Sequence, residues 1–244
     1  MGLISDLRIL YHLALHPIRG ATHAERLDNF YRGQAEGYDT FRERLLRGRD
    51  ELWAALPVPA GGVWLDLGGG TGANAERLGE RIGALRKFYI VDLAPSLLAI
   101  ARRRIAQRGW THVEAVEADA TEFVPAEGAA DVVTFSYSLT MIPDWFAAVD
   151  HAWRVLRPGG HIGVVDFYVS RKHPAAPGMA RHGWLTRHFW PAWFGGDNVF
   201  PSPDHLPYLL RRFEPVSLLE NRAAVPYLPL ARVPYYLFIG LKPQ

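Results

Sequence analysis

The stretch WLDLGGGTGANAERL, residues 64–78, decides the fold predicted for this chain. Four glycines among five residues separate a short apolar run from a run that suits a helix. The stretch matches two patterns, G-x-G-x-x-A at Gly68, Gly70 and Ala73, and D-x-G-x-G-x-G from Asp66 to Gly72. Because glycine lacks a side chain, such a turn lets a ligand approach the backbone closely. The stretch therefore predicts a ligand-binding loop between a first strand and a helix.

Strands and helices alternate outward from this loop. The expected strands occupy 63–67, 88–93, 113–119, 131–138 and 161–169. The expected helices run from the loop to about Gly83, then over 95–108 and 145–156, with a turn at 157–160. Two β-like runs at 214–221 and 235–242 close the chain. This alternation predicts an α/β fold with a parallel, doubly wound sheet and right-handed crossovers.

Composition and charge exclude several classes of protein. The chain has 244 residues, of which 49% are hydrophobic and 21% charged, as is ordinary for a globular protein with a sizeable core. Its net charge of +2 gives no general electrostatic case for a nucleic-acid partner. It has no cysteine, which excludes thiolate metal sites, and we expect no bound metal. No apolar run reaches the ~18 residues that span a bilayer, so we expect a cytoplasmic protein.

Residues 1–19 predict an amphipathic helix. Ser5, Arg8, His12, His16 and Arg19 form one polar stripe, and apolar residues cover the rest. A wide apolar face beside a narrow cationic stripe suits a membrane interface. The residues expected to contact the membrane are Leu3, Ile4, Leu7, Arg8, Leu10 and Tyr11. A helix packed on its own domain fits the same pattern, and the sequence leaves both interpretations open.

Three acidic residues choose between possible ligands of the glycine loop. Asp66 precedes the first glycine by two residues and would repel a dinucleotide pyrophosphate, whereas it would attract a sulfonium or ammonium. Asp92 ends the second strand and suits the ribose hydroxyls of either kind of cofactor. Asp119, followed by Ala120, ends the third strand and suits an adenine amino group. Together the acids favour a cationic nucleoside over a dinucleotide.

From about Tyr38 to Phe167 these motifs, with RPGG at 157–160, resemble the class I S-adenosylmethionine-dependent methyltransferases. The resemblance implies a seven-stranded, mostly parallel, Rossmann-like sheet whose last strand is antiparallel. It implies S-adenosyl-L-methionine as cofactor and S-adenosyl-L-homocysteine as product. We divide the chain into N-terminal amphipathic and capping helices (1–56) and a methyltransferase domain (57–244), with an inserted cover after strand five (170–212). The expected cofactor-binding residues are Tyr38, Asp66, Gly68, Gly70, Gly72, Asp92, Leu93, Asp119, Ala120 and Ser136.

Aromatic residues predict the methyl-acceptor side. AEGYDTF, residues 35–41, resembles the Tyr-Asp element that caps the cofactor in ubiquinone-type and phospholipid-type methyltransferases. We expect Tyr38 and Tyr137 to be catalytic, because a tyrosine hydroxyl can hold an amine and its ring can face a cation. The expected substrate-binding residues are Tyr31, Arg49, Met141, Trp190 and Tyr235. Ordinary packing explains Tyr31, Met141 and the aromatic cover equally well.

Over nearly its full length the chain resembles the N-methyltransferase component of bacterial betaine-lipid synthesis. Three segments carry this resemblance: residues 23–52, 197–214 and 225–242. It implies threefold methylation of the amine of diacylglyceryl-homoserine to diacylglyceryl-trimethylhomoserine, on the inner face of the membrane. The protein would then act after the enzyme that makes diacylglyceryl-homoserine. Phosphatidylethanolamine N-methylation, methylation of a soluble small molecule or quinone, and a non-catalytic cofactor-binding regulator stay open as alternatives.

Overall fold

The computed structural model describes residues 22, 25 and 45–244, except 174–175, 197, 226–227 and 229–230. The expected interfacial helix at 1–19, with all six of its membrane residues, lies outside the described residues, as do Tyr31 and Tyr38. Of the N-terminal helices expected over 1–56, the described part contains α4 (Arg49–Ala55).

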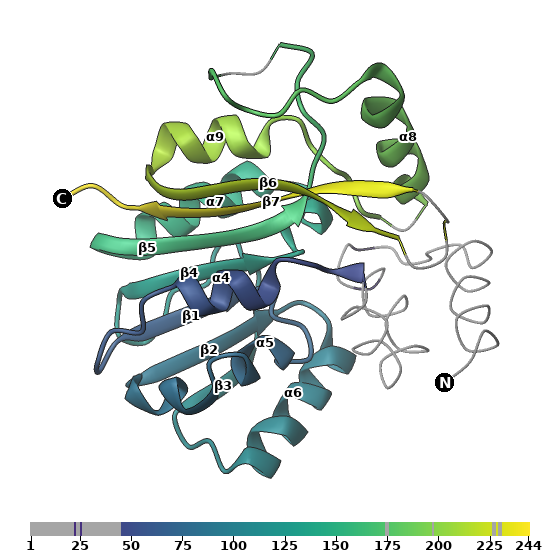
Figure 1. Cartoon of the computed structure of the whole chain (residues 1–244). Coiled ribbons are helices and arrows are strands. Elements are labelled where there is room, and N and C mark those ends of the chain that lie inside the picture. Colours follow the sequence, from purple (N-terminus) through teal and green to yellow (C-terminus); the bar gives the residue numbers. More distant parts are fainter. Residues whose placement is uncertain are drawn as a thin grey trace.

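Seven strands form one sheet, in the order β3-β2-β1-β4-β5-β7-β6 (Figure 1). The strands are β1 (Val63–Leu67), β2 (Lys87–Asp92), β3 (Val113–Glu117), β4 (Ala130–Ser136), β5 (Leu156–Phe167), β6 (Glu214–Ala224) and β7 (Arg232–Leu241). β7 runs antiparallel to both of its neighbours, and the pairs from β3 to β5 are parallel. The predicted doubly wound, seven-stranded sheet with an antiparallel last strand is confirmed.

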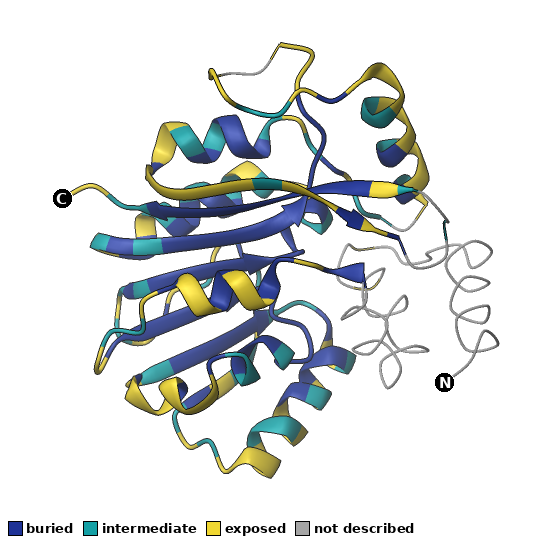
Figure 2. Cartoon of the chain, viewed as in Figure 1, coloured by how far each residue is buried: buried dark blue, intermediate teal, exposed yellow. Residues whose placement is uncertain are grey.

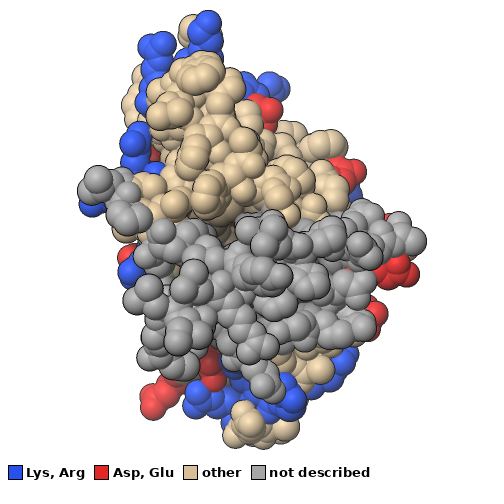
Figure 3. Space-filling model, turned by 90° about the vertical axis from the view of Figure 1, so that its right-hand side faces the viewer, with Lys and Arg blue, Asp and Glu red and all other residues tan. Residues whose placement is uncertain are grey.

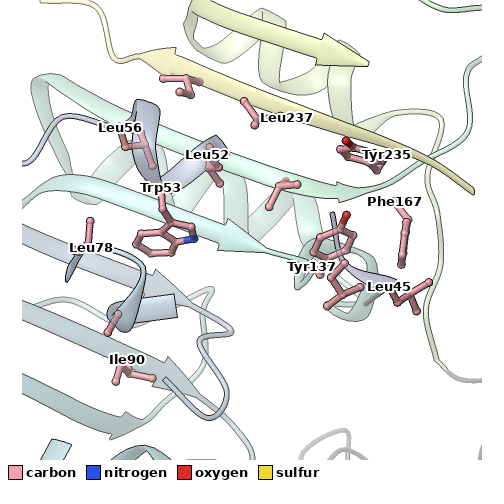
Figure 4. Packing of buried hydrophobic residues seen from close by; sticks show 14 of the residues in the cluster. Leu45, Leu52, Trp53, Leu56, Leu78, Ile90, Tyr137, Phe167, Tyr235 and Leu237 are labelled. Atoms are coloured by element: carbon pink, nitrogen blue, oxygen red, sulfur yellow. The ribbon is translucent and has the colours of Figure 1, made fainter. Parts of the chain in front are cut away.

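Helices cover both faces of the sheet. α4, α5 (Ala73–Glu76) and α6 (Pro95–Arg108) contribute to one buried cluster, and α7 (Trp145–Val155) and α9 (His205–Arg212) contribute to the other. All five residues of β1 are buried, as expected for a central parallel strand. On the α4 face, Trp53 lies among the buried apolar residues of this cluster (Figure 4), and its ring stacks on that of Trp64 with centroids 5.0 Å apart. The core therefore consists of two apolar layers with the sheet between them.

Two expected elements differ from the structure. The helix expected from the loop to about Gly83 is broken into α5 and the 3-10 helix η1 (Gly79–Ala84), because Gly79 has φ +55°. The turn expected at 157–160 lies inside β5 as a bulge, because the register with β4 passes from Leu156 to His161 and Gly159 has φ +78°. The Gly159 amide donates to the Lys242 carbonyl and the Lys242 amide donates to the Gly160 carbonyl, so these two hydrogen bonds hold the bulge at the start of β5.

The expected cover, residues 170–212, contains α8 (Trp184–Gly195) and α9. α9 packs against α7, β6 and β7, and its Leu206 and Leu209 are buried in the core. α8 lies at the end of the molecule toward which the parallel strands point (Figure 1). Within the described ranges, no helix is both long and apolar enough to cross a membrane.

Candidate functional site

A pocket of about 280 Å³ lies at the carboxyl ends of β1, β2 and β4. This is the edge at which open α/β sheets bind ligands. Its walls come from the glycine loop, the ends of β2 and β3, and the segment between β4 and α7. The lining residues on the first side are Gly68, Gly70, Val91, Asp92, Leu93, Leu97, Ala118, Asp119, Ala120 and Thr121. Those on the other side are Tyr137, Ser138, Met141, Ile142, Pro143 and Asp144.

The glycine loop needs its glycines for space as well as for backbone angles. Gly68 has φ +71°, and a Cβ there would lie 2.4 Å from the Ser138 Cβ. Gly70 has φ +57° and lines the pocket. The sequence therefore permits a close approach of the loop to β4 on one side and of a ligand to the backbone on the other.

Internal partners satisfy the loop amides. The amides of Gly68 and Gly69 both donate to the Val91 carbonyl, at 2.8 and 3.0 Å. The Gly70 amide donates to Asp92 Oδ2 at 2.8 Å. A phosphate-binding loop offers its amides to the anion. Here a carboxylate already holds the Gly70 amide, so a pyrophosphate at this turn would meet negative charge.

Two backbone amides hold Asp92 in place. Its Oδ1 also accepts from the Ala94 amide at 2.9 Å, which fixes the carboxylate at the end of β2 on the pocket wall. Each carboxylate oxygen has a second lone pair that can accept from a ligand hydroxyl.

Asp66 does not face the pocket. It is fully buried behind the glycine loop, where Oδ2 accepts from Asn74 Nδ2 at 3.0 Å and Oδ1 accepts from Thr134 Oγ1 at 2.9 Å. The expectation that this carboxylate directly faces a cationic ligand is therefore wrong in geometry. Asp66 instead ties β1, β4 and α5 together beneath the loop.

Asp119 supplies a second acceptor on the same wall as Asp92. Its Oδ1 accepts from the amide and the hydroxyl of Thr121, at 2.8 and 2.7 Å. This turn holds the carboxylate beside Ala120, which also lines the pocket with Leu93. Two fixed acceptors with small or apolar neighbours fit the hydroxyls and amino group of a nucleoside.

Other expected residues lie outside the lining. Gly72 has φ +71° and packs against Ile90. Ser136 is buried at the end of β4, directly before the pocket residue Tyr137. Trp190 and Tyr235 are buried in the core, and Arg49 is buried at the start of α4. These five residues therefore do not line the pocket.

Tyr137 and Met141 form the opposite wall. Tyr137 has φ +56°, an uncommon backbone conformation for a residue with a side chain. Its hydroxyl donates to the Arg47 carbonyl at 2.6 Å, and its ring packs edge-on against Phe167 at 4.7 Å (Figure 4). Burial raises the pKa of Tyr137 well above its usual range, with the nearby Asp166 adding to the effect. The phenol is therefore neutral and fixed.

Sequence reasoning missed the acid beneath this wall. Asp166, on β5, is fully buried and accepts from the hydroxyl of Thr140 at 2.8 Å and from its amide at 3.1 Å. Burial raises the pKa of Asp166 to about 7. It fixes the segment that follows Tyr137. The apolar run HIGVVDFYV with a single acid in it was the available signal.

The family of the chain follows from comparison with known proteins. The profile of the ubiE/COQ5 methyltransferase family matches residues 24–182, more than half of the chain. The chain belongs to this family. S-adenosylmethionine is the cofactor typical of the family. The pocket lined by the carboxylates of Asp92 and Asp119 fits this cofactor. The family and the fold of the chain are therefore those of the class I S-adenosylmethionine-dependent methyltransferases.

Individual relatives are distant. A ubiquinone/menaquinone biosynthesis C-methyltransferase of Pseudomonas putida is 27% identical over 162 residues, which is 64% of this chain and 63% of that protein. The chain thus spans less than two thirds of the length of this relative.

Solved structures show the same fold. A phosphoethanolamine N-methyltransferase of Haemonchus contortus, in complex with S-adenosyl-L-methionine, has a TM-score of 0.70 and 16% identity, covering 92% of this chain and 61% of that one. The [4+2]-cyclase SpnF has a TM-score of 0.66 and 17% identity, covering 93% and 98%. Because these neighbours include a cyclase, fold likeness does not name the reaction.

Proposed function

We propose that this methyltransferase transfers methyl groups to the amine of a membrane lipid, diacylglyceryl-homoserine, in three rounds that end in diacylglyceryl-trimethylhomoserine. The observation that carries the methyl-transfer half is the pocket wall on which Asp92 holds the Gly70 amide and Asp119 lies beside it. The choice of a lipid substrate rests on the resemblance of residues 23–52, 197–214 and 225–242 to the betaine-lipid N-methyltransferase.

Asp92 and Asp119 hold the nucleoside in this proposal. Asp92 accepts from ribose hydroxyls and Asp119 accepts from the adenine amino group, while Gly68 and Gly70 let the ligand lie against the backbone. When bound, S-adenosylmethionine supplies a methyl group activated by the positive charge on its sulfur. Leu93 and Ala120 provide apolar contacts for the base.

The pocket wall opposite Asp92 and Asp119, which we call the acceptor wall, suits an amine. Tyr137, Met141 and Ile142 present a neutral and mostly apolar surface, which removes water from the nitrogen lone pair. The amine must lose a proton before each of the three transfers so that its nitrogen has a lone pair, and that proton passes to water. The fixed Tyr137 ring can face the cation that grows with each round. Tyr38 and Tyr31 complete the site in the proposal, on sequence grounds alone.

Two segments outside the family match favour the betaine-lipid substrate. The family profile ends at residue 182, whereas the resemblance to the betaine-lipid N-methyltransferase includes 197–214 and 225–242. These segments supply β7, which pairs with β5, and α9, which packs against β7. The proposal places the protein on the inner face of the membrane, after the enzyme that makes diacylglyceryl-homoserine.

Quinone C-methylation is the second candidate. It is favoured by the 27% identity to ubiquinone/menaquinone C-methyltransferases over 162 residues. Methylating a ring carbon requires electron density on that carbon, which comes from removing a phenolic proton. The two candidates therefore differ in the need for a base beside the acceptor.

A direct competition separates the candidates. Purified protein is incubated with labelled S-adenosylmethionine and vesicles that contain diacylglyceryl-homoserine, phosphatidylethanolamine and a ring-demethylated quinol. The proposal predicts label in the homoserine lipid as mono-, di- and trimethyl forms, identified by mass spectrometry. Label in the quinol ring or in phosphatidylethanolamine instead would replace the proposed substrate.

A further inference from the structure

The outer face of α8 is an exposed aromatic surface. Trp184 and Leu185 are 68% and 70% exposed, and Phe189 and Trp193 follow at helical spacing and are also exposed (Figure 2). We define these four residues as the α8 face. Its rings stack on neighbours, Trp184 on His188 at 4.6 Å and Phe189 on Trp193 at 5.6 Å. Exposed contiguous apolar surface of this kind marks an interaction site.

The opposite side of α8 anchors it to the rest of the protein. Trp190 and Phe194 are buried and stack on each other, with ring centroids 5.6 Å apart. Phe194 stacks on Phe167 at 5.0 Å, and Phe167 contacts Tyr137, which lines the pocket. A continuous row of rings thus joins the α8 helix to the acceptor wall. The outward aromatics are therefore presented on a fixed helix and are not needed for its packing.

The segment that contains α8 is basic. Residues 170–196 contain four basic residues, Arg171, Lys172, Arg181 and Arg187, and no Asp or Glu. Arg171 pairs with Asp204, whereas Lys172 and Arg181 are exposed. In Figure 3 Lys and Arg lie at the top and left of the uncharged surface in the upper part of the molecule, and Asp and Glu lie at its right. Aromatic rings with flanking cations are the chemistry of a lipid headgroup interface, and anionic lipids complement the charge.

We infer that the α8 face docks on the surface of an anionic lipid bilayer and sets the pocket against it. The inference deepens the proposed function and rests on it for the lipid nature of the substrate. Figure 1 shows α8 at the same end of the molecule as the carboxyl ends of the parallel strands, where the pocket opens. The Phe200 amide, beyond α8, donates to the Thr140 carbonyl at 2.8 Å and adds a second link to the pocket segment. Docking on this face would thus place a headgroup at the acceptor wall.

Vesicle binding tests the inference without any methyl transfer. The full-length Leu185→Ser/Trp193→Ser variant is compared with wild type by sedimentation with vesicles of phosphatidylglycerol and phosphatidylcholine. Loss of two inserted apolar side chains predicts a partition coefficient lower by about tenfold or more. The matched control is Val216→Ser/Leu219→Ser on β6, which removes side chains of 59% and 43% exposure and should bind as wild type does.

Charge supplies a second readout. Lys172→Glu/Arg181→Glu should weaken binding to the phosphatidylglycerol vesicles by about tenfold and leave the weaker binding to pure phosphatidylcholine unchanged. Equal binding of the α8 variant and wild type would overturn the inference. So would a dimer in light scattering that the α8 variant abolishes, because a second copy would then be the occupant. A fall of several degrees in the melting temperature would also overturn it, because the chain's own residues would then cover the face.

The two proposals fail separately. If vesicle binding depends on the α8 face but no amino lipid is methylated, the docking surface stands and the proposed substrate does not. If diacylglyceryl-homoserine in vesicles is methylated at an unchanged rate by the α8 variant, the proposed function stands and the docking inference is overturned.

Discussion

At the scale of single residues, Asp92 lines the pocket and Asp66 does not. Asp66 was identified from its position before the glycines and Asp92 from its position at the end of the second strand, but a sequence pattern does not give the direction of a side chain. Asp66 sits on a strand whose residues are all buried, and Asn74 and Thr134 take up its carboxylate. Asp92 ends its strand, so its carboxylate reaches both the loop amide and the pocket.

Removing the Asp92 carboxylate should weaken cofactor binding. Asp92→Ala is expected to raise the dissociation constant of S-adenosylhomocysteine by about tenfold to a hundredfold, the worth of lost hydrogen bonds to a charged group. Calorimetric titration measures this. Glu117→Ala is the control, because Glu117 pairs in register with Asp92 on β3 but is exposed and outside the pocket lining. Undiminished affinity in Asp92→Ala would remove this residue from the site.

Tyr137 should act through position rather than proton transfer. Its pKa lies well above the usual range because of burial, so the hydroxyl stays protonated throughout the working range of pH. Tyr137→Phe is expected to lower stability by about 1 kcal/mol through the lost bond to the Arg47 carbonyl. Methyl transfer should fall by no more than about tenfold, with an unchanged pH profile. A thousandfold loss with a shifted profile would make the hydroxyl a proton acceptor.

His205 should make the fold sensitive to acid. It is fully buried, neither ring nitrogen has a hydrogen-bond partner within the described part of the chain, and burial lowers its pKa to about 3. The unfolded chain binds the proton near pH 6.5, so stability is lost as the pH falls from there toward 3, by about 1.4 kcal/mol per unit. His205→Leu should remove this loss, giving a gain of about 2 kcal/mol at pH 5 relative to the gain at pH 8. Urea unfolding at the two values of pH measures it, and equal gains would contradict the assignment.

At the scale of elements, the sequence could predict most strands and helices but not where each of them begins and ends. The apolar run at 63–67 and the N-terminal proline of α6 fix those elements locally. The continuation of β5 through the RPGG segment could not be predicted, because the hydrogen bonds of Gly159 and Gly160 are made with Lys242 near the far end of the chain. The pocket segment after β4 was found only in part, since Asp166 acts on it from β5.

The glycine loop should tolerate no side chain at position 68. Gly68→Ala adds a Cβ at 2.4 Å from the Ser138 Cβ at a backbone angle of φ +71°. We expect a loss of roughly 2–5 kcal/mol in unfolding free energy, combining backbone strain and overpacking. Gly61→Ala is the control, because Gly61 has φ +68° with nothing near its Cβ, and it should lose only the backbone part. Equal losses in urea unfolding would show that the Ser138 contact costs nothing.

At the scale of the whole molecule, the fold places the chemistry at one edge. The parallel strands bring the glycine loop, Asp92 and Asp119 together at their carboxyl ends, and the cover places α8 at the same end (Figure 1). This convergence was predictable from the alternation of strands and helices. The identity of the methyl acceptor could not be predicted from this alternation, because it depends on segments that follow no repeating pattern.

The most direct test of the account is a crystal structure of the protein with S-adenosylhomocysteine. The account predicts ribose hydroxyls within about 3 Å of the Asp92 carboxylate and the adenine amino group at the same distance from Asp119. Asp66 should stay buried on Asn74 and Thr134 behind the loop. Ligand density outside this pocket, or a nucleoside that contacts neither carboxylate, would contradict it.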